Sequence, residues 1–372
     1  MKNEKGKCRI NVMMVGGRRC GKTSVIAAMK DSFQKVLGGS SDLLVVPDST
    51  ETKKKLYEKS LEIADYFARD MAAPFTPDNN PDEAIVHYKF EFRLKGKKES
   101  SVFLDICDYP GEWLNPSHPE YEAHEPELKE VMKKSNIVII AIDTVALMEK
   151  AASRSSEDVG RFNPHINFCS SITDMIIADF DAEENGSPKM IIFVPLKCEK
   201  YWNRSKTSQD DQMSLVNARI HTAYKGIFDF VGGSNKGRYE IVIAPILTFG
   251  ENTAEFARYE DKDGEIILDE KYKLPTAKYT FVNKSARYSP MYCEQPLLYI
   301  LAYLLEEMRK LKQAQKDKAN FLKLFFMYLG EKYGDISSAE DFLEQRDKIK
   351  CTLKISGDGY EVTEDPLGFR GG

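Results

Sequence analysis

The chain has 372 residues, of which 42% are hydrophobic and 30% are charged, and its formal net charge is −5. This length and apolar content suffice for a large core, built as one large domain or two. The slightly acidic balance gives no global signal for nucleic acid, so we expect no nucleic-acid partner.

The seven cysteines are scattered, odd in number and without a C-x-x-C pair, which predicts a reducing, cytoplasmic location and no disulfide framework. No apolar run approaches the roughly 18–20 residues of a membrane span. The charged start MKNEKGKCR is predicted to be neither a signal peptide nor an anchor.

The first element is an apolar strand over about residues 9–15, followed by a glycine-rich turn and a helix over about 22–36. The turn has the spacing G-x-x-x-x-G-K-T from Gly16 to Thr23, in which glycines let backbone N–H groups converge on a phosphate. Lys22 is expected to reach the β- and γ-phosphates, and the Thr23 hydroxyl to hold Mg²⁺. A chance match is the alternative, but the strand before and the helix after are the context that the motif requires. The predicted phosphate-binding residues are Gly16, Gly17, Arg18, Arg19, Cys20, Gly21, Lys22, Thr23 and Ser24.

Two arginines, Arg18 and Arg19, lie inside this turn. Either side chain could contact the γ-phosphate as a built-in arginine finger. The plainer interpretation, which we favour, is that both point to solvent and only add positive potential.

A long charged helix is predicted over about 50–72, with a cap at residues 48–50, and a loop rich in Pro, Asp and Asn follows. A switch that senses Mg²⁺ needs a Ser or Thr in this region. Thr76 is the favoured metal ligand, and an ordinary loop threonine is the alternative. Ser49, Thr50 and Thr52 compete with it but are better placed to cap or start the helix.

Residues 84–94 alternate polar and apolar side chains, which predicts a half-exposed antiparallel edge strand, and residues 101–107 form a buried strand. The buried strand runs into D-Y-P-G-E-W. Asp108 is predicted to hold Mg²⁺, and Gly111 to offer its N–H to the γ-phosphate. Glu112 lies where it could orient the attacking water, so the predicted catalytic residues are Lys22, Gly111 and Glu112. The alternative for Asp108 is a turn residue at a strand end.

Strands and helices then alternate to the end of a strong helix at about 294–316. Further strands are predicted at 136–142, 189–195 and 239–247, and helices at 124–134, 144–183 (with a break) and 208–231. Residues 248–290 form a hairpin-bearing insertion. This order predicts an α/β fold with three layers, whose sheet is mostly parallel with one antiparallel edge strand.

The strand at 189–195 is followed by Leu196-Lys197-Cys198-Glu199. Lys197 and Glu199 have the spacing of a base-recognition motif, in which the lysine stem covers the base and the acid accepts from guanine. Leu196 and the longer acid depart from that motif, so GTP is favoured over ATP but both stay open. An exposed strand-end charged pair is the alternative.

We expect one nucleotide-binding domain over residues 1–315, with insertions at about 38–75, 144–183 and 248–290, and a C-terminal extension over 316–372. The basic and then apolar segment 309–329 could contact a membrane surface or a partner, but packing on its own domain is favoured. The extension should also hold an acidic helix at 338–348 and a short hairpin. Its end, up to Gly371-Gly372, resembles ubiquitin-type modifiers, although an ordinary flexible terminus is favoured.

The motifs G-x-x-x-x-G-K-T, D-Y-P-G-E-W and L-K-C-E, with Thr76, resemble those of P-loop GTPases of the translation-factor and Ras-like class. Within that class the chain is most similar to bacterial YcjX-like and double-GTPase domain proteins. The resemblance implies a Mg²⁺-dependent, GTP- or ATP-hydrolysing switch encoded with partners of bacterial stress or conflict systems. The leading hypothesis is therefore a GTP hydrolase acting on a protein partner or as a homodimer. A nucleotide-binding scaffold with little hydrolysis, and an ATPase of the same fold, are the alternatives.

Overall fold

The computed structural model describes residues 8–370 with gaps. The longer gaps are 38–42, 69–84, 95–101, 150–166, 183–188, 203–211, 268–274, 283–287 and 315–348, and shorter ones include Arg19 and Gly264. Thr76, the segment 321–329, the expected acidic helix and Gly371-Gly372 therefore lie outside the described residues.

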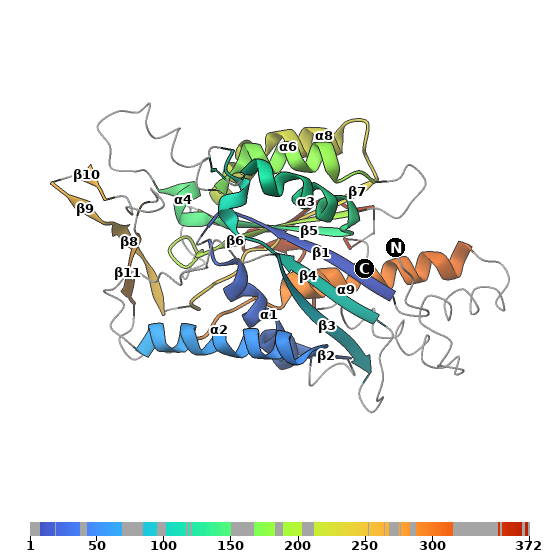
Figure 1. The fold of residues 1–372 in the computed structure, drawn as a ribbon, viewed down its shortest axis with the longest axis horizontal. Coiled ribbons are helices and arrows are strands. Elements are labelled where there is room, and N and C mark those ends of the chain that lie inside the picture. Colours follow the sequence, from blue (N-terminus) through green and yellow to red (C-terminus); the bar gives the residue numbers. More distant parts are fainter. Residues whose placement is uncertain are drawn as a thin grey trace.

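A nine-stranded sheet forms the middle of the molecule, in the order β12-β13-β7-β6-β5-β1-β4-β3-β2 (Figure 1). Its five central strands are parallel and comprise β7 (Tyr239–Ile243), β6 (Lys189–Leu196), β5 (Ile137–Asp143), β1 (Cys8–Val15) and β4 (Val102–Asp108). Antiparallel pairing adds β3 (Val86–Leu94) and β2 (Leu43–Pro47) at one edge, and β13 (Tyr360–Glu364) and β12 (Ser356–Gly357) at the other.

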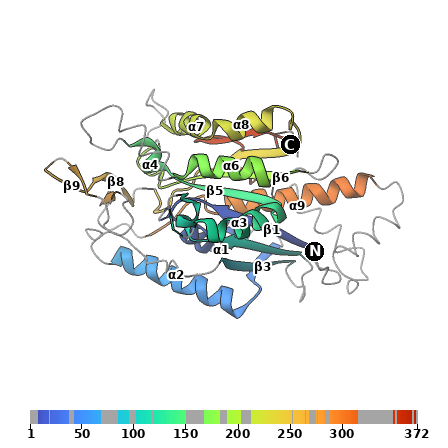
Figure 2. The same cartoon turned by 45° about the horizontal axis from the view of Figure 1, so that its top comes forward.

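Helices cover both faces of this sheet, which gives the three layers visible in Figure 2. One face packs against α1 (Lys22–Leu37), α2 (Thr50–Ala68) and α9 (Gln295–Ala314). The other packs against α3 (Tyr121–Lys134), α4 (Thr144–Met148), α6 (Cys169–Asp179), α7 (Gln212–Ala223) and α8 (Lys225–Gly232). Because the central strands are covered on both sides, they read as continuous apolar runs, as in β5 with its sequence IVIIAID. The α/β class and the mostly parallel sheet are confirmed.

The edges of the sheet differ from the prediction. Residues 43–47 form β2, which pairs with the predicted edge strand β3, so the chain has antiparallel strands beyond the one expected. Only five residues form this strand, too short a run to separate it from a loop by pattern alone. The helix expected at 208–231 is two helices, α7 and α8, which meet at the fully buried Tyr224.

The predicted hairpin insertion is present. Strand β8 (Ala254–Tyr259) pairs with β11 (Ala277–Phe281), and β9 (Asp261–Lys262) pairs with β10 (Glu265–Ile266). Figure 1 shows this hairpin projecting from the side of the molecule.

The short C-terminal hairpin, expected inside a separate extension, is part of the central sheet. Val362 of β13 pairs with Val242 of β7, and the Tyr360 hydroxyl donates to the Pro245 carbonyl over 2.9 Å. Phe369 is buried, with its ring edge against Tyr299 of α9. The described residues between 349 and 370 thus belong to the same sheet and core as the elements before them. Among the described helices, none is both long and apolar enough to cross a membrane.

Candidate nucleotide site

The glycine-rich turn leaves the carboxyl end of β1, where the chain crosses to β4 on one side and to β5 on the other. Such a switch point is where open α/β sheets bind ligands. A Cβ on Gly16, whose φ is +154°, would lie 2.6 Å from the Ala141 carbonyl oxygen. Gly21 has φ +110°, so both motif glycines have a backbone that other residues rarely adopt.

The Lys22 side chain lies inside the glycine-rich turn and bonds to its backbone. Its Nζ donates to the carbonyl oxygens of Gly16 and Gly17 over 2.9 and 3.2 Å, and the side chain is buried. The helix α1 begins at this residue and carries no acid in its first turn. No acid within the helix itself therefore offsets its positive end, which favours an anion at the turn.

Thr23 and Asp108 meet beside Lys22. The Thr23 hydroxyl donates to Asp108 Oδ2 over 2.7 Å, while Asp108 Oδ1 is buried without a hydrogen-bond partner among the described residues. Burial raises the pKa of the Asp108 carboxyl, and the Lys22 ammonium and the Thr23 hydroxyl oppose that rise. Mg²⁺ prefers oxygen ligands, and here a hydroxyl oxygen lies beside a carboxylate oxygen that has no hydrogen-bond partner among the described residues. Thr23 and Asp108 therefore fit this ion.

Arg18 does not point to solvent, contrary to the favoured interpretation. Its guanidinium forms an ion pair with Glu112, and both side chains are buried. The second carboxylate oxygen of Glu112 is buried without a hydrogen-bond partner in the described residues. The residue expected to orient water is thus held by an arginine of the turn, a contact across 94 positions of sequence.

The segment after β4 lies directly on the turn. Residues Gly111–Leu114 form a short 3-10 helix, and a Cβ on Gly111 would lie 2.4 Å from the Arg18 amide nitrogen. Only glycine permits this approach. Trp113 anchors the segment, since it is fully buried and stacks on His124 of α3 with ring centroids 3.4 Å apart.

Lys197 and Glu199 both lie just beyond β6, but each has an intramolecular partner. Lys197 has φ +60°, and its Nζ donates to Asp143 Oδ2 over 2.5 Å. Asp143 ends β5 and also caps α4, because its Oδ1 accepts from the Ala146 N–H. The sequence pattern around Asp143 marks only a strand end, and nothing in it indicates that this residue is the partner of Lys197.

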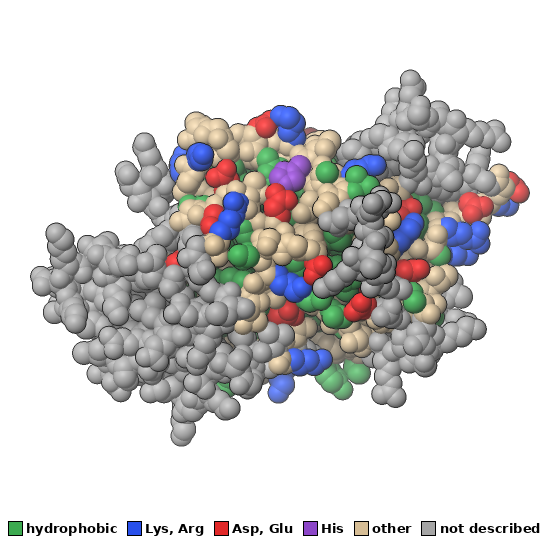
Figure 3. All heavy atoms as spheres, turned by 180° about the vertical axis from the view of Figure 1, so that it is seen from behind, with side chains coloured by type: hydrophobic (Ala, Val, Ile, Leu, Met, Phe, Trp, Pro, Cys, Tyr) green, Lys and Arg blue, Asp and Glu red, His purple; other side chains and the backbone are tan. Residues whose placement is uncertain are grey.

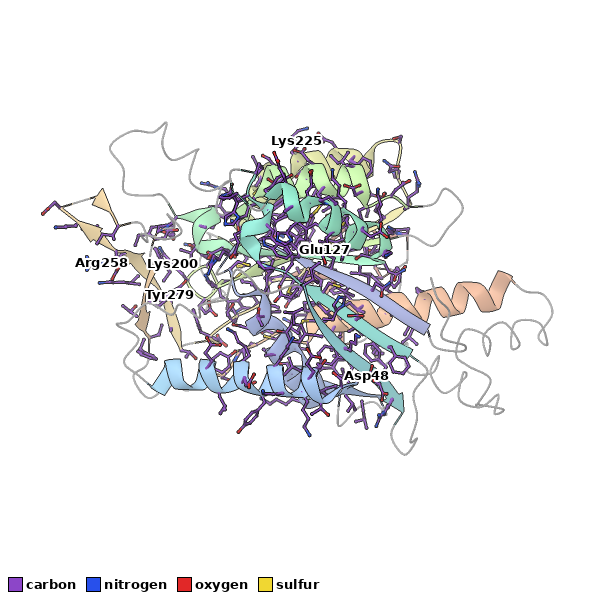
Figure 4. The ribbon with its side chains drawn as sticks, viewed as in Figure 1. Asp48, Glu127, Lys200, Lys225, Arg258 and Tyr279 are labelled. Atoms are coloured by element: carbon purple, nitrogen blue, oxygen red, sulfur yellow. The ribbon has the colours of Figure 1, made fainter. Side chains whose placement is uncertain are left out.

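Glu199 is turned into the protein. Its Oε1 accepts from the Phe249 N–H over 2.6 Å, so the carboxylate holds the loop that follows β7. The Phe249 ring in turn contacts Tyr279 of the projecting hairpin, edge to face at 5.0 Å. Figure 4 shows Tyr279 and Lys200 on this side of the molecule, where Lys200 Nζ lies 5.1 Å from the centre of the Phe256 ring. The hairpin is therefore tied to the segment that follows β6.

Glu199→Gln should change the pH dependence of stability. Burial raises the pKa of Glu199 from 4.5 to about 7, so above pH 4.5 the folded protein holds a proton that the unfolded chain has lost. Stability therefore falls as the pH rises from 4.5 to about 7. At 1.36 kcal/mol per pKa unit, the variant should gain up to about 3 kcal/mol on the wild type across this window. Urea unfolding at both ends of the window measures it, and an equal difference at the two pH values would contradict it.

Of the remaining predictions, Thr76 and Arg19 fall outside the described residues. Ser49 caps α2 by accepting from the Thr52 N–H, and the Thr52 hydroxyl accepts from the Lys89 N–H of β3. These two competitors of Thr76 thus have structural partners. Cys20 is buried beside Gly16, and Ser24 lies partly buried in α1.

The sheet order, the turn between β1 and α1 and the lysine folded over it are those of a P-loop fold. No protein-family model matches the chain, and no curated protein matches it. Solved structures similar to it include Sup35 complexed with GDP, at 9% identity and a TM-score of 0.29, over 68% of this chain and 40% of that chain. Another is the Ski7 GTPase-like domain of S. cerevisiae, bound to GDP and inorganic phosphate, at 13% identity and a TM-score of 0.33. That alignment covers 64% of this chain and 43% of the solved domain, so the chain spans less than half of either structure.

Proposed function

We propose that the protein is a Mg²⁺-dependent nucleotide switch that hydrolyses GTP to GDP and phosphate. The observation that carries this proposal is the hydrogen bond between Thr23 and Asp108, formed beside the Lys22 ammonium and the glycine-rich turn. A hydroxyl, a carboxylate and an ammonium meet there at the positive end of α1, which is the set of groups that a nucleotide triphosphate with its metal needs.

Each group has a task in this proposal. Thr23 and Asp108 hold Mg²⁺, which neutralises charge on the phosphates when bound. Lys22 exchanges the Gly16 and Gly17 carbonyls for phosphate oxygens. Gly111, which lies against the turn, offers its N–H to the terminal phosphate, and Glu112 orients the attacking water. The Arg18–Glu112 pair must open or shift for Glu112 to do so, and the Arg18 guanidinium could then stabilise charge on the phosphates.

The same ion pair favours the scaffold hypothesis as the second candidate. If the Glu112 carboxylate stays paired with Arg18, it cannot orient water, and the protein would bind nucleotide without hydrolysing it. Both guanine and adenine stay candidates for the base that the protein recognises, because Lys197 and Glu199 are bonded to Asp143 and Phe249. An ATPase of this fold would use the same phosphate groups.

For its role in the cell, we propose control of a protein partner, or of a second copy of this chain, in a bacterial stress or defence system. This part rests on the resemblance of the motifs. On the face shown in Figure 3, the coloured Lys and Arg side chains are interspersed with Asp and Glu, which suits a protein partner better than a nucleic acid.

Asp108→Asn is expected to lower phosphate release from GTP by about 10²-fold or more, because the amide removes the charge that holds the ion. The experiment measures phosphate release with GTP and with ATP at several Mg²⁺ concentrations, and excess chelator should stop the wild-type reaction. Asp229→Asn, an exposed position on α8, is the matched control and should keep wild-type rates. Hydrolysis of ATP without binding of GTP would support the ATPase hypothesis instead. Undiminished GTP turnover in Asp108→Asn would contradict the proposed metal site.

A further inference from the structure

A second cluster of metal-binding side chains lies on the sheet, away from the glycine-rich turn. It consists of His87 on β3 and of Asp105 and Cys107 on β4, two neighbouring antiparallel strands (Figure 1). His87 lies directly across from Cys107 in the register, and Asp105 is two residues from Cys107. Because side chains alternate along a strand, the three residues share one face of the sheet.

The donor atoms of these residues converge. One nitrogen, one oxygen and one sulfur all lie within 4.8 Å of one another. His87 Nδ1 is 2.9 Å from Asp105 Oδ1 and 3.3 Å from Cys107 Sγ. Within the part of the chain that the structure describes, this is the one group of three such ligands that meets so closely.

This geometry does not suit a nucleophilic cysteine. In a Cys-His-Asp arrangement, the two nitrogens of the ring contact different partners. Here Nδ1 faces both the carboxylate and the thiol, while Nε2 is 3.9 Å from the sulfur. The three donor atoms therefore form one compact group, as the ligands of a single ion do.

The kind of ion follows from the donors. Bond lengths of about 2.0–2.3 Å place the ligands of a tetrahedral zinc ion about 3.3–3.8 Å apart. His87 Nδ1 lies 3.3 Å from Cys107 Sγ and 2.9 Å from Asp105 Oδ1, so a small outward shift of these side chains would admit the ion. A thiolate with an imidazole selects a transition metal over Mg²⁺ or Ca²⁺. Asp105 and Cys107 are buried, whereas the His87 side chain is 46% exposed, so solvent reaches the cluster from the side of His87.

We propose that His87, Asp105 and Cys107 bind one thiophilic divalent transition-metal ion, such as Zn²⁺, through three protein ligands. The site is separate from the one proposed for Mg²⁺. Asp108 follows Cys107 on the same strand, but its side chain points to the opposite face of the sheet. The ion would tie β3 to β4 immediately before the segment that carries Gly111 and Glu112.

The test uses the full chain, nucleotide-free and treated with chelator and a reductant that does not bind metal. Cobalt chloride is titrated in, and the thiolate-to-cobalt charge-transfer absorption is recorded, because that band reports a sulfur ligand. We expect the band to saturate at one equivalent and zinc chloride to abolish it by displacement. Cys107→Ser should remove the band, and His87→Ala should weaken cobalt binding by at least about tenfold.

Two variants serve as controls. Cys169→Ser alters another buried cysteine, on α6, and Asp108→Asn alters the proposed Mg²⁺ site, so both should keep the band. Zinc chloride should also raise the melting temperature of the wild type but not that of Cys107→Ser, which circular dichroism must first show to be folded.

The absence of a charge-transfer band in the wild type would overturn the proposal and leave an ordinary His87–Asp105 ion pair. A band that persists in Cys107→Ser, or one that Asp108→Asn removes, would overturn it equally. Because the titration needs no nucleotide, a failure to hydrolyse GTP would not affect its outcome.

Discussion

Replacing Lys22 with alanine is expected to lower phosphate release from GTP by about 10²–10³-fold. The Lys22 ammonium lies inside the glycine-rich turn, where it donates to the Gly16 and Gly17 carbonyls. Its loss removes the charge that would stabilise the β- and γ-phosphates. A continuous phosphate-release assay at saturating GTP measures the effect.

Lys22→Met separates charge from packing in this experiment, since it keeps an unbranched stem and removes only the ammonium. Lys225→Ala, an exposed lysine on α8, is the matched control and should leave the rate unchanged. An unchanged rate of GTP hydrolysis in both Lys22 variants would contradict the proposed hydrolase. Tight nucleotide binding by the wild type without phosphate release would favour the scaffold instead.

Breaking the Arg18–Glu112 pair is expected to destabilise the nucleotide-free protein by about 3–5 kcal/mol for either single substitution. The reason is that Arg18→Met or Glu112→Gln removes the opposite charge with which the buried partner side chain is paired. The double variant should cost clearly less than the sum of the two, because neither charge then remains. Urea unfolding of the four proteins measures this coupling.

The Lys225–Asp229 pair on α8 provides the control double-mutant cycle. Both side chains are exposed, so their coupling energy should be close to zero. Additive effects of Arg18→Met and Glu112→Gln would contradict a buried pair. Phosphate release by Glu112→Gln then separates two roles for the carboxylate. A loss of turnover indicates that Glu112 orients water, whereas a gain indicates that the ion pair restrains the segment after β4.

Local patterns predicted the parts of the fold that depend on neighbours in the sequence. The apolar runs of β1, β4, β5 and β6 and the alternation of β3 follow from where each strand lies in the sheet. The glycine-rich turn was equally predictable, because its glycine backbone and the helix after it are encoded within a few residues. Thr23 and Asp108 could be paired in advance, since the carboxyl ends of neighbouring parallel strands meet at one edge.

What the sequence alone determined is therefore the parallel part of the sheet and the conformation of the glycine-rich turn. Only the tertiary structure decided how the charged side chains are engaged, because the choice of partner depends on groups brought together by folding. Arg18 pairs with Glu112 across 94 positions, and Lys197 with Asp143 across 54. Burial drives these choices, since a charge removed from water must find the nearest opposite charge or donor, wherever the chain has placed it. The C-terminal hairpin joined the sheet for a related reason, because the edge of β7 offers backbone groups that a short strand can satisfy.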